Sequence, residues 1–137
     1  MNSGPFEDRL ELRELIENFA NSAMRIDPDA WGANWAEEGY WKLPSMPEAA
    51  EGKANIVAAF EKAMAYVNFF SMICTPSDLN IEGDTATGKA YCREQIYTKT
   101  GGQVYVVGCY HDEFVKRDGR WLFLKRVYEV IGKDINT

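Results

Sequence analysis

Residues 103–131 read QVYVVGCYHDEFVKRDGRWLFLKRVYEVI, two long runs of β-forming residues around the turn RDG at 117–119. An Asp-Gly turn between two such runs is typical of a β-hairpin. Before it, Thr85–Thr98 predicts another strand, and Asn68–Ile81 predicts a fourth, with Pro76 as a candidate break. The second half of the chain therefore predicts a meander of four long antiparallel strands.

The first half of the chain carries helical patterns instead. Pro5–Ile26 repeats apolar residues at helical spacing, and the pair Asp27-Pro28 ends that run. We expect a short second helix carrying Trp31 and Trp35, a short strand over residues 39–43 and a third helix over about 54–67. Helices that precede strands predict an α+β fold. Three N-terminal helices would pack on a curved, mostly antiparallel sheet and form a cone with a central pocket.

Length and composition set limits on the function. The 137 residues predict a single domain over residues 1–137, and we expect the tail 132–137 to be frayed. A net charge of −6 argues against nucleic-acid binding. We expect the late basic residues to form a solvated hairpin face; they are Lys116, Arg117, Arg120, Lys125 and Arg126.

The few histidines and cysteines exclude several kinds of site. A single histidine excludes a site with two or three histidine ligands within one chain. Three cysteines without a C-x-x-C pair indicate neither a zinc knuckle nor a disulfide framework, so we predict no metal. Reduced thiols, with no signal sequence and no apolar run of about 18 residues, lead us to expect a cytoplasmic protein without a membrane partner.

Several short motifs, in this order and spacing, resemble SnoaL-like proteins of the nuclear-transport-factor-2-like superfamily. They are RID at 25–27, NWAEEGYW at 34–41, IEGDTA at 81–86, GCYHDEF at 108–114, RDGRW at 117–121 and KR at 125–126. The resemblance implies a cone with one deep apolar pocket. Members include scytalone dehydratase, ketosteroid isomerase, polyketide cyclases and hexachlorocyclohexane dehydrochlorinase, and most need no cofactor, so we expect none here.

The resemblance also implies roles for individual residues. In dehydratase-like and dehydrochlorinase-like members, an aspartate at the position of Asp27 orients or activates a histidine, and a last-strand arginine at the position of Arg126 helps to bind a leaving anion. The partner histidine of that family is replaced by Cys74. Asp27 could otherwise simply end the first helix, and Arg126 could form an ion pair with Asp112 or Glu129.

Further candidates follow from the residues themselves. His111 is the sole imidazole, and strand alternation places it on the face opposite Tyr110, so only one of them can line the pocket. Tyr40 or Tyr110 could donate a hydrogen bond to a substrate oxygen. Glu94 shares a face with small residues, so it projects into the pocket as a second carboxylate or pairs with a basic residue of a neighbouring strand.

These observations give two hypotheses. The first is a cofactor-independent lyase, dehydratase or isomerase that acts by acid–base chemistry on a small hydrophobic, aromatic or polycyclic molecule. Its predicted catalytic residues are Asp27, Arg126, His111 and Tyr40. Its predicted substrate-binding residues are Trp31, Trp35, Trp41, Phe70, Met72, Cys74, Glu94, Tyr110 and Tyr128. The second is a non-catalytic binding or structural subunit. In either case we expect a homodimer or homotrimer, because Tyr91 and Tyr105 leave the outer sheet face apolar.

Overall fold

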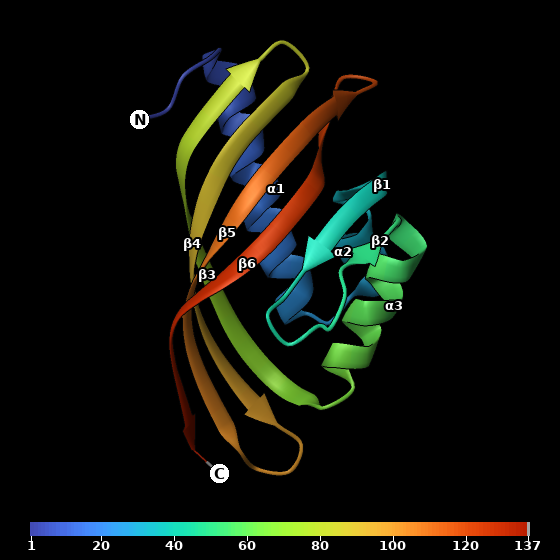
Figure 1. Ribbon diagram of the computed structural model, residues 1–137, viewed down its shortest axis with the longest axis vertical. Helices are drawn as coiled ribbons and strands as arrows, with labels where there is room; N and C mark the ends of the chain where they lie inside the picture. Colours follow the sequence, from blue (N-terminus) through green and yellow to red (C-terminus); the bar gives the residue numbers. More distant parts are fainter. Residues whose placement is uncertain (137) are drawn as a thin grey trace.

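A computed structural model describes residues 1–136 as helices packed on one side of a strongly bent sheet (Figure 1). The sheet has six strands in the order β2-β1-β6-β5-β4-β3 and does not close on itself. The strand β1 pairs in parallel with β6, and the other pairs are antiparallel. The predicted α+β class and the mostly antiparallel sheet are confirmed.

The helices come from the first half of the chain, as predicted. Helix α1 spans Phe6–Met24, and α2 is a single short turn over Pro28–Gly32. Helix α3 spans Lys53–Met64, and Val67 already begins the next strand, so the predicted helical end at 67 is wrong by three residues. Helix α1 buries the expected apolar stripe, which includes Leu12 and Ile16.

The region around Trp35 differs from the prediction. Trp35 begins strand β1, Trp35–Lys42, rather than continuing the second helix. The reason is tertiary: Trp35 pairs with Phe123 of β6, and the Phe123 backbone N–H donates to the Asn34 carbonyl at 2.8 Å. A pairing with a strand almost 90 positions away is invisible to local periodicity. The two-residue strand β2, Ala50–Glu51, was not predicted either.

The predicted meander is present. Strand β3 spans Val67–Glu82, β4 spans Thr85–Thr98, β5 spans Gln103–Arg117 and β6 spans Arg120–Asn136. The strand β3 runs through Pro76, which is tolerated because β3 is the outermost strand of the sheet.

The tail predicted to fray is instead paired. Asn136 lies opposite Gln103, so β6 continues to the end of the described residues. The predicted tail also included Thr137, which lies outside them. Pairing with β5 supplies hydrogen-bond partners that residues 132–136 could not find locally.

Alternation along the long strands separates two faces. Glu94, Tyr110 and Tyr128 face the concave side, which α1, α2 and α3 cover. His111 and its neighbours in register face the convex side. The core therefore lies between the concave face and the helices. Over residues 1–136, no helix is long and apolar enough to span a membrane.

Candidate functional site

A cavity of about 340 Å³ lies between the concave face of the sheet and the three helices. Its lining is mostly apolar and aromatic, which is the usual character of a site for a small organic ligand. The lining residues contributed by the helices and by the loop after β1 include Phe19, Ala23, Trp31, Leu43, Pro44, Phe60 and Met64. Those contributed by strands include Trp41, Phe70, Met72, Glu94, Ile96, Val104, Val106, Tyr110 and Tyr128.

Glu94 is the carboxylic acid of this cavity. It projects from β4, and the Tyr128 hydroxyl of β6 donates a hydrogen bond to Glu94 Oε2 at 2.6 Å. Burial raises the pKa of Glu94, and the hydrogen bond from Tyr128 offsets only part of that rise. Burial and the adjacent carboxylate also raise the pKa of the Tyr128 hydroxyl, which keeps it a donor. A carboxyl group with a raised pKa in an apolar cavity can both accept and return a proton near neutral pH.

A second phenol lies beside this pair. The rings of Tyr110 and Tyr128 are 4.5 Å apart between centroids. Trp41 Nε1 donates to the Tyr110 hydroxyl oxygen at 3.1 Å. Within residues 1–136, no side chain is seen to accept the Tyr110 hydroxyl hydrogen, so it is free to bind a ligand oxygen. Burial raises the pKa of Tyr110 well above its ordinary value, so this hydroxyl also stays protonated.

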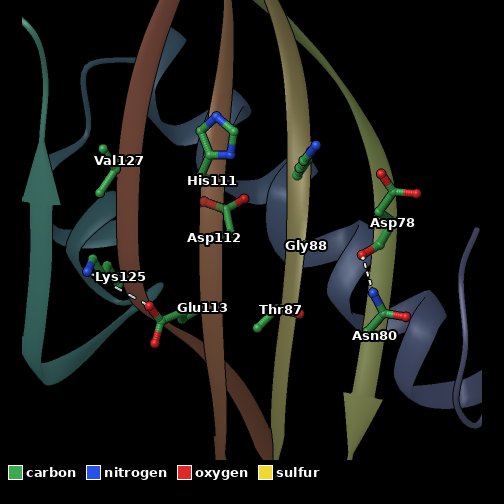
Figure 2. Close-up of a pocket in the computed structure, with 10 residues that line it drawn as sticks. Asp78, Asn80, Thr87, Gly88, His111, Asp112, Glu113, Lys125 and Val127 are labelled. Carbon is green, nitrogen blue, oxygen red and sulfur yellow. Dashed lines mark hydrogen bonds and ion pairs between the residues drawn. The ribbon is translucent and has the colours of Figure 1, made fainter.

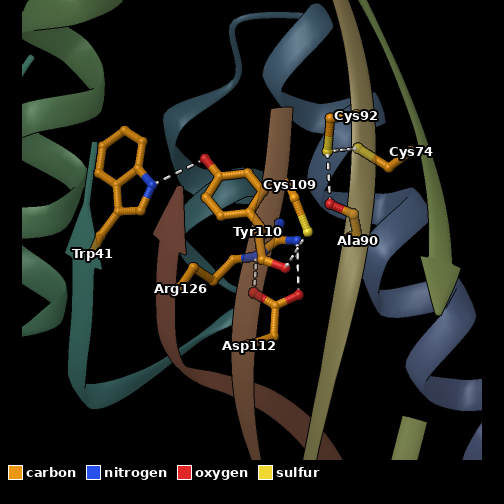
Figure 3. Close-up of polar contacts among 8 residues, drawn as sticks. All are labelled: Trp41, Cys74, Ala90, Cys92, Cys109, Tyr110, Asp112 and Arg126. Atoms are coloured by element: carbon orange, nitrogen blue, oxygen red, sulfur yellow. Dashed lines mark hydrogen bonds and ion pairs between the residues drawn. The ribbon is translucent and has the colours of Figure 1, made fainter. Parts of the chain in front are cut away.

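Arg126 lies beneath Tyr110 rather than in the cavity (Figure 3). Its guanidinium carbon is 3.8 Å from the centroid of the Tyr110 ring. Its Nε and Nη2 donate to the two carboxylate oxygens of Asp112 at 2.7 and 3.0 Å, and both side chains are fully buried. The buried ion pair, one of the predicted alternatives, is therefore present. It supports the ring of Tyr110 from below by a cation–π contact.

Charge and burial act in opposite directions on this pair. Burial raises the pKa of Asp112, and the charge of Arg126 offsets only part of that rise. Burial alone would lower the pKa of Arg126, but the charge of Asp112 and its hydrogen bonds raise it overall. Arg126 and Asp112 thus form a buried, mutually hydrogen-bonded pair beside Tyr110.

The structure brings together most of the predicted substrate-binding residues. Seven of them line the cavity: Trp31, Trp41, Phe70, Met72, Glu94, Tyr110 and Tyr128. Trp35 does not, because it is fully buried in the core against Phe19 and Phe123. Cys74 also lies outside the lining, beside Cys92.

None of the four residues predicted as catalytic lines this cavity. Asp27 caps α2, with its carboxylate accepting the Ala30 backbone N–H at 3.1 Å. Arg126 is covered by Tyr110, as described above. Tyr40 precedes Trp41 on β1 and therefore takes the other side of the strand, where Lys125 Nζ lies 4.9 Å from its ring.

His111 occupies the convex face. Its Nε2 lies 2.9 Å from Glu129 Oε1, and its side chain is 46% exposed. It lines a groove of about 460 Å³ on this face. Figure 2 shows Glu113 and Lys125 on the same face. Glu113 and Lys125 are open to water and form an ion pair at 3.9 Å. Asp112 also lines the groove, but its carboxylate is fully buried and bound to Arg126, so it is not a free acid there.

A cluster of three possible metal ligands lies on the convex face. Cys109, His111 and Glu129 place one ligand atom each within 4.8 Å of the others, on the convex face. Sulfur, imidazole and carboxylate are donors that zinc accepts. These residues lie on the side of the sheet away from the cavity, so they contribute nothing to the acid site.

Sequence reasoning missed Lys133, which lies at the rim of the cavity. Residues 132–137 were expected to be frayed, so no side chain there was considered. Phe19 and Phe60 also line the cavity, although their helical spacing had indicated core positions only. The strand register places Glu94 beside Val106 and Val106 beside Lys133 on one face of the sheet. Alternation along these strands is the sequence signal that could have placed Lys133 at the cavity.

Gly108 creates the space that the Tyr128 hydroxyl occupies. A Cβ atom at Gly108 would lie 2.3 Å from both Cζ and Oη of Tyr128. We expect Gly108→Ala to push the tyrosine off Glu94, with a loss of about 1–3 kcal/mol in stability from overpacking. Denaturant unfolding measures the stability. Without its hydrogen bond, Glu94 should show a still higher pKa by NMR titration.

Gly132→Ala is the matched control, because a Cβ there meets nothing within 4 Å. It lies on the adjacent strand and should leave both the stability and the Glu94 pKa near wild-type values. Equal effects of the two substitutions would contradict the role assigned to Gly108.

A bent sheet with helices around one apolar, acid-containing cavity defines an α+β cone protein of the nuclear-transport-factor-2-like class. The model of the SnoaL-like domain matches residues 5–127, and the chain belongs to this family. The family resemblance seen in the sequence is thereby confirmed. No curated protein matches the chain.

Solved structures share this fold at low sequence identity. A protein of Novosphingobium aromaticivorans, provisionally named an aromatic ring hydroxylase, is 23% identical with a TM-score of 0.87, covering 98% of this chain and 95% of the other. A type 2 hexachlorocyclohexane dehydrochlorinase is 13% identical with a TM-score of 0.87, covering 96% and 90%. A protein of Novosphingobium aromaticivorans, provisionally named a scytalone dehydratase, is 18% identical with a TM-score of 0.79, covering 93% and 86%.

Proposed function

We propose that this protein is a cofactor-independent lyase or isomerase in which Glu94 transfers a proton to and from a small apolar substrate. The observation that carries the proposal is the Glu94 carboxyl group in the apolar cavity, with a raised pKa and a 2.6 Å hydrogen bond from Tyr128. Perturbed acids in such cavities are typical of acid–base sites. The dehydratase and dehydrochlorinase names among the structural neighbours agree with this class of chemistry.

The geometry suggests how a dehydration would proceed. The ionised Glu94 takes a proton from a carbon next to a substrate carbonyl, and the electron pair moves to form an enolate. Tyr110 donates its free hydroxyl hydrogen to the enolate oxygen. Collapse of the enolate expels a hydroxyl group from the next carbon, and Glu94 returns its proton to form water. The substrate gains a double bond, and Glu94 ends ionised as it began.

Tyr128 and Arg126 assist without reacting. Tyr128 holds the Glu94 carboxylate in one orientation through its 2.6 Å hydrogen bond. Arg126 lies 3.8 Å below the Tyr110 ring, where its charge stabilises negative charge that develops on the oxygen bound by Tyr110. Both side chains are part of the folded core, so they need not reorganise during the reaction.

The lining also indicates the substrate class. A volume of about 340 Å³ is at the lower end for ligand pockets, so the substrate is small. The aromatic rings of Trp31, Trp41 and Tyr110 suit an aromatic or flat cyclic molecule. Glu94 and Lys133 are the two charged residues among the described lining residues, which favours a mostly uncharged substrate body.

The experiment is a screen of small aromatic carbonyl and β-hydroxycarbonyl compounds, without added metal or cofactor. Thermal shift reports binding, and mass spectrometry reports loss of water or isomerisation. Turnover that requires Glu94 supports the proposal. Binding without turnover across the screen would contradict it and would support the alternative of a non-catalytic binding protein.

Asp27 provides a second test, because it is among the catalytic residues predicted from the sequence. Asparagine is a good helix cap, so Asp27→Asn should preserve α2 and the stability of the fold. If Glu94 is the acid, turnover by this variant stays within a few-fold of wild type. A loss of turnover in Asp27→Asn as large as that of Glu94→Gln would instead assign the acid–base role to Asp27.

We also propose a homo-oligomer formed through the convex face. Ile73, Tyr91 and Val107 are exposed on this face at 67%, 45% and 45%, and they lie on neighbouring strands. An apolar patch of this kind is commonly covered by a partner, here a second copy of the chain. Light scattering at micromolar concentration should show a dimer or trimer. Val107→Glu should reduce it to a monomer, whereas a wild-type monomer would contradict the proposal.

A further inference from the structure

Two cysteine thiols meet on the concave face of the sheet, outside the cavity lining. Cys74 on β3 and Cys92 on β4 are direct partners in the strand register. Their sulfur atoms are 2.7 Å apart, and both are free thiols (Figure 3). A disulfide bond is about 2.05 Å long, so the sulfurs need to approach by well under 1 Å.

The backbone is already compatible with a bond between them. Directly opposed residues of antiparallel strands have Cα atoms about 4.5–5.5 Å apart. Disulfides occur at Cα separations of about 4.4–6.8 Å, so the strands need not move. Cys109, the third cysteine, is buried and faces the convex side. It is therefore not a partner for either thiol.

The two thiols differ in reactivity. Cys74 is partly exposed on the outermost strand, whereas Cys92 is 1% exposed. The hydrogen bond between the two thiols lowers the pKa of Cys74, and the same interaction, with burial, raises the pKa of Cys92. Thiolates rather than thiols attack disulfides, so Cys74 is the residue that reacts first.

We propose that Cys74 and Cys92 form a thiol–disulfide exchange site that reacts with low-molecular-weight disulfides such as oxidised glutathione. The Cys74 thiolate attacks one sulfur of oxidised glutathione, whose disulfide bond breaks and releases one glutathione. Cys92 then loses its proton and attacks the Cys74 sulfur of the mixed disulfide, releasing the second glutathione. The protein loses two hydrogen atoms and becomes oxidised, and oxidised glutathione is reduced to two thiols.

The site adjoins the acid of the cavity. Glu94 follows Cys92 by two positions on the same face of β4. Cys92 is also paired in register with Gly108 of β5, and the Tyr128 hydroxyl packs against Gly108. The exchange reaction itself needs neither Glu94 nor turnover, so its test is independent of the proposed enzyme activity.

The test exposes the folded, fully reduced chain to buffers of oxidised and reduced glutathione. Remaining thiols are then alkylated in denaturant and located by peptide mass spectrometry. We expect a loss of two hydrogens, one cross-linked peptide pair containing Cys74 and Cys92, and full alkylation of Cys109. Circular dichroism confirms that the protein stays folded during the reaction.

Three variants separate the roles. Cys92→Ser should accumulate one glutathione on Cys74, because no second thiol resolves the mixed disulfide. Cys74→Ser should remain unmodified, and Cys109→Ser should behave as wild type. Three free thiols in the wild type under conditions that oxidise a reference dithiol would overturn the proposal. Equal glutathione addition to Cys74→Ser and Cys92→Ser would overturn the order of attack.

Discussion

Replacing Glu94 by glutamine is expected to lower turnover by about 10²- to 10⁴-fold while ligand binding is retained. This range is the usual contribution of a positioned general acid or base. Glutamine has nearly the same shape and still accepts the hydrogen bond from Tyr128 at Oε1, but it cannot take up a proton. The loss should therefore appear in kcat, measured by steady-state kinetics on the substrate that the screen identifies.

The same substitution should stabilise the protein at high pH. Glu94 has a pKa above its unfolded value, so the folded state holds the proton more tightly than the unfolded state. This contribution to stability is complete below the unfolded pKa and is lost as the pH rises through the folded pKa. Glutamine has no such dependence. Unfolding curves at several pH values should show Glu94→Gln gaining on wild type as the pH rises.

Glu113→Gln is the matched control for both measurements. Glu113 lies on β5 at the convex face, where its side chain is exposed. Its substitution makes the same acid-to-amide change outside the cavity. It should leave turnover unchanged and should shift stability by less than about 0.5 kcal/mol. Normal turnover in Glu94→Gln would contradict the assignment of the acid.

Removing Asp112 is the change expected to damage the fold most. Asp112→Ala leaves the Arg126 guanidinium fully buried without its carboxylate partner. Breaking a buried ion pair from one side costs about 3–5 kcal/mol, because the remaining charge is uncompensated. Urea unfolding, with the midpoint and slope compared to wild type, measures the loss.

The double variant Asp112→Ala/Arg126→Met tests the cause. Methionine fills much of the space of the arginine without a charge, so the double variant should be more stable than Asp112→Ala alone. A double variant less stable than Asp112→Ala would show that packing at Asp112, rather than the unpaired charge, explains the loss. As a control, the double variant Lys125→Met/Glu113→Ala removes an exposed ion pair of the convex face and should lower the stability only slightly.

The strand meander was predictable because its information is local. Turn residues at Glu82-Gly83-Asp84 and at 117–119 lie between long runs of β-forming residues, and these runs pair with their neighbours in sequence. The helices α1 and α3 were predictable from their spacing of apolar residues. The predicted ends of elements were less accurate where pairing with a distant strand sets the boundary, as at Trp35 and at residues 132–136.

The candidate site was predictable in part. Alternation alone places Tyr110 and His111 on opposite faces of their strand, and that separation is present in the structure. Alternation does not say which carboxylate is desolvated. Asp27 and Glu94 were both candidates, and the difference between them is that Asp27 binds a helix N-terminus and Glu94 lies in an apolar cavity.

The order of residues by itself therefore determined the strand meander, helices α1 and α3, the two faces of each strand and the family, because each depends on neighbours within a few positions or on motif order. Only the tertiary structure decided which acid is buried, which phenol binds it and that Arg126 is sealed beneath Tyr110. These properties depend on curvature of the sheet and on contacts between segments far apart in sequence. Desolvation and hydrogen bonding across such contacts set the pKa of Glu94. The groups that make these contacts come from several segments of the chain, so no single segment predicts that pKa.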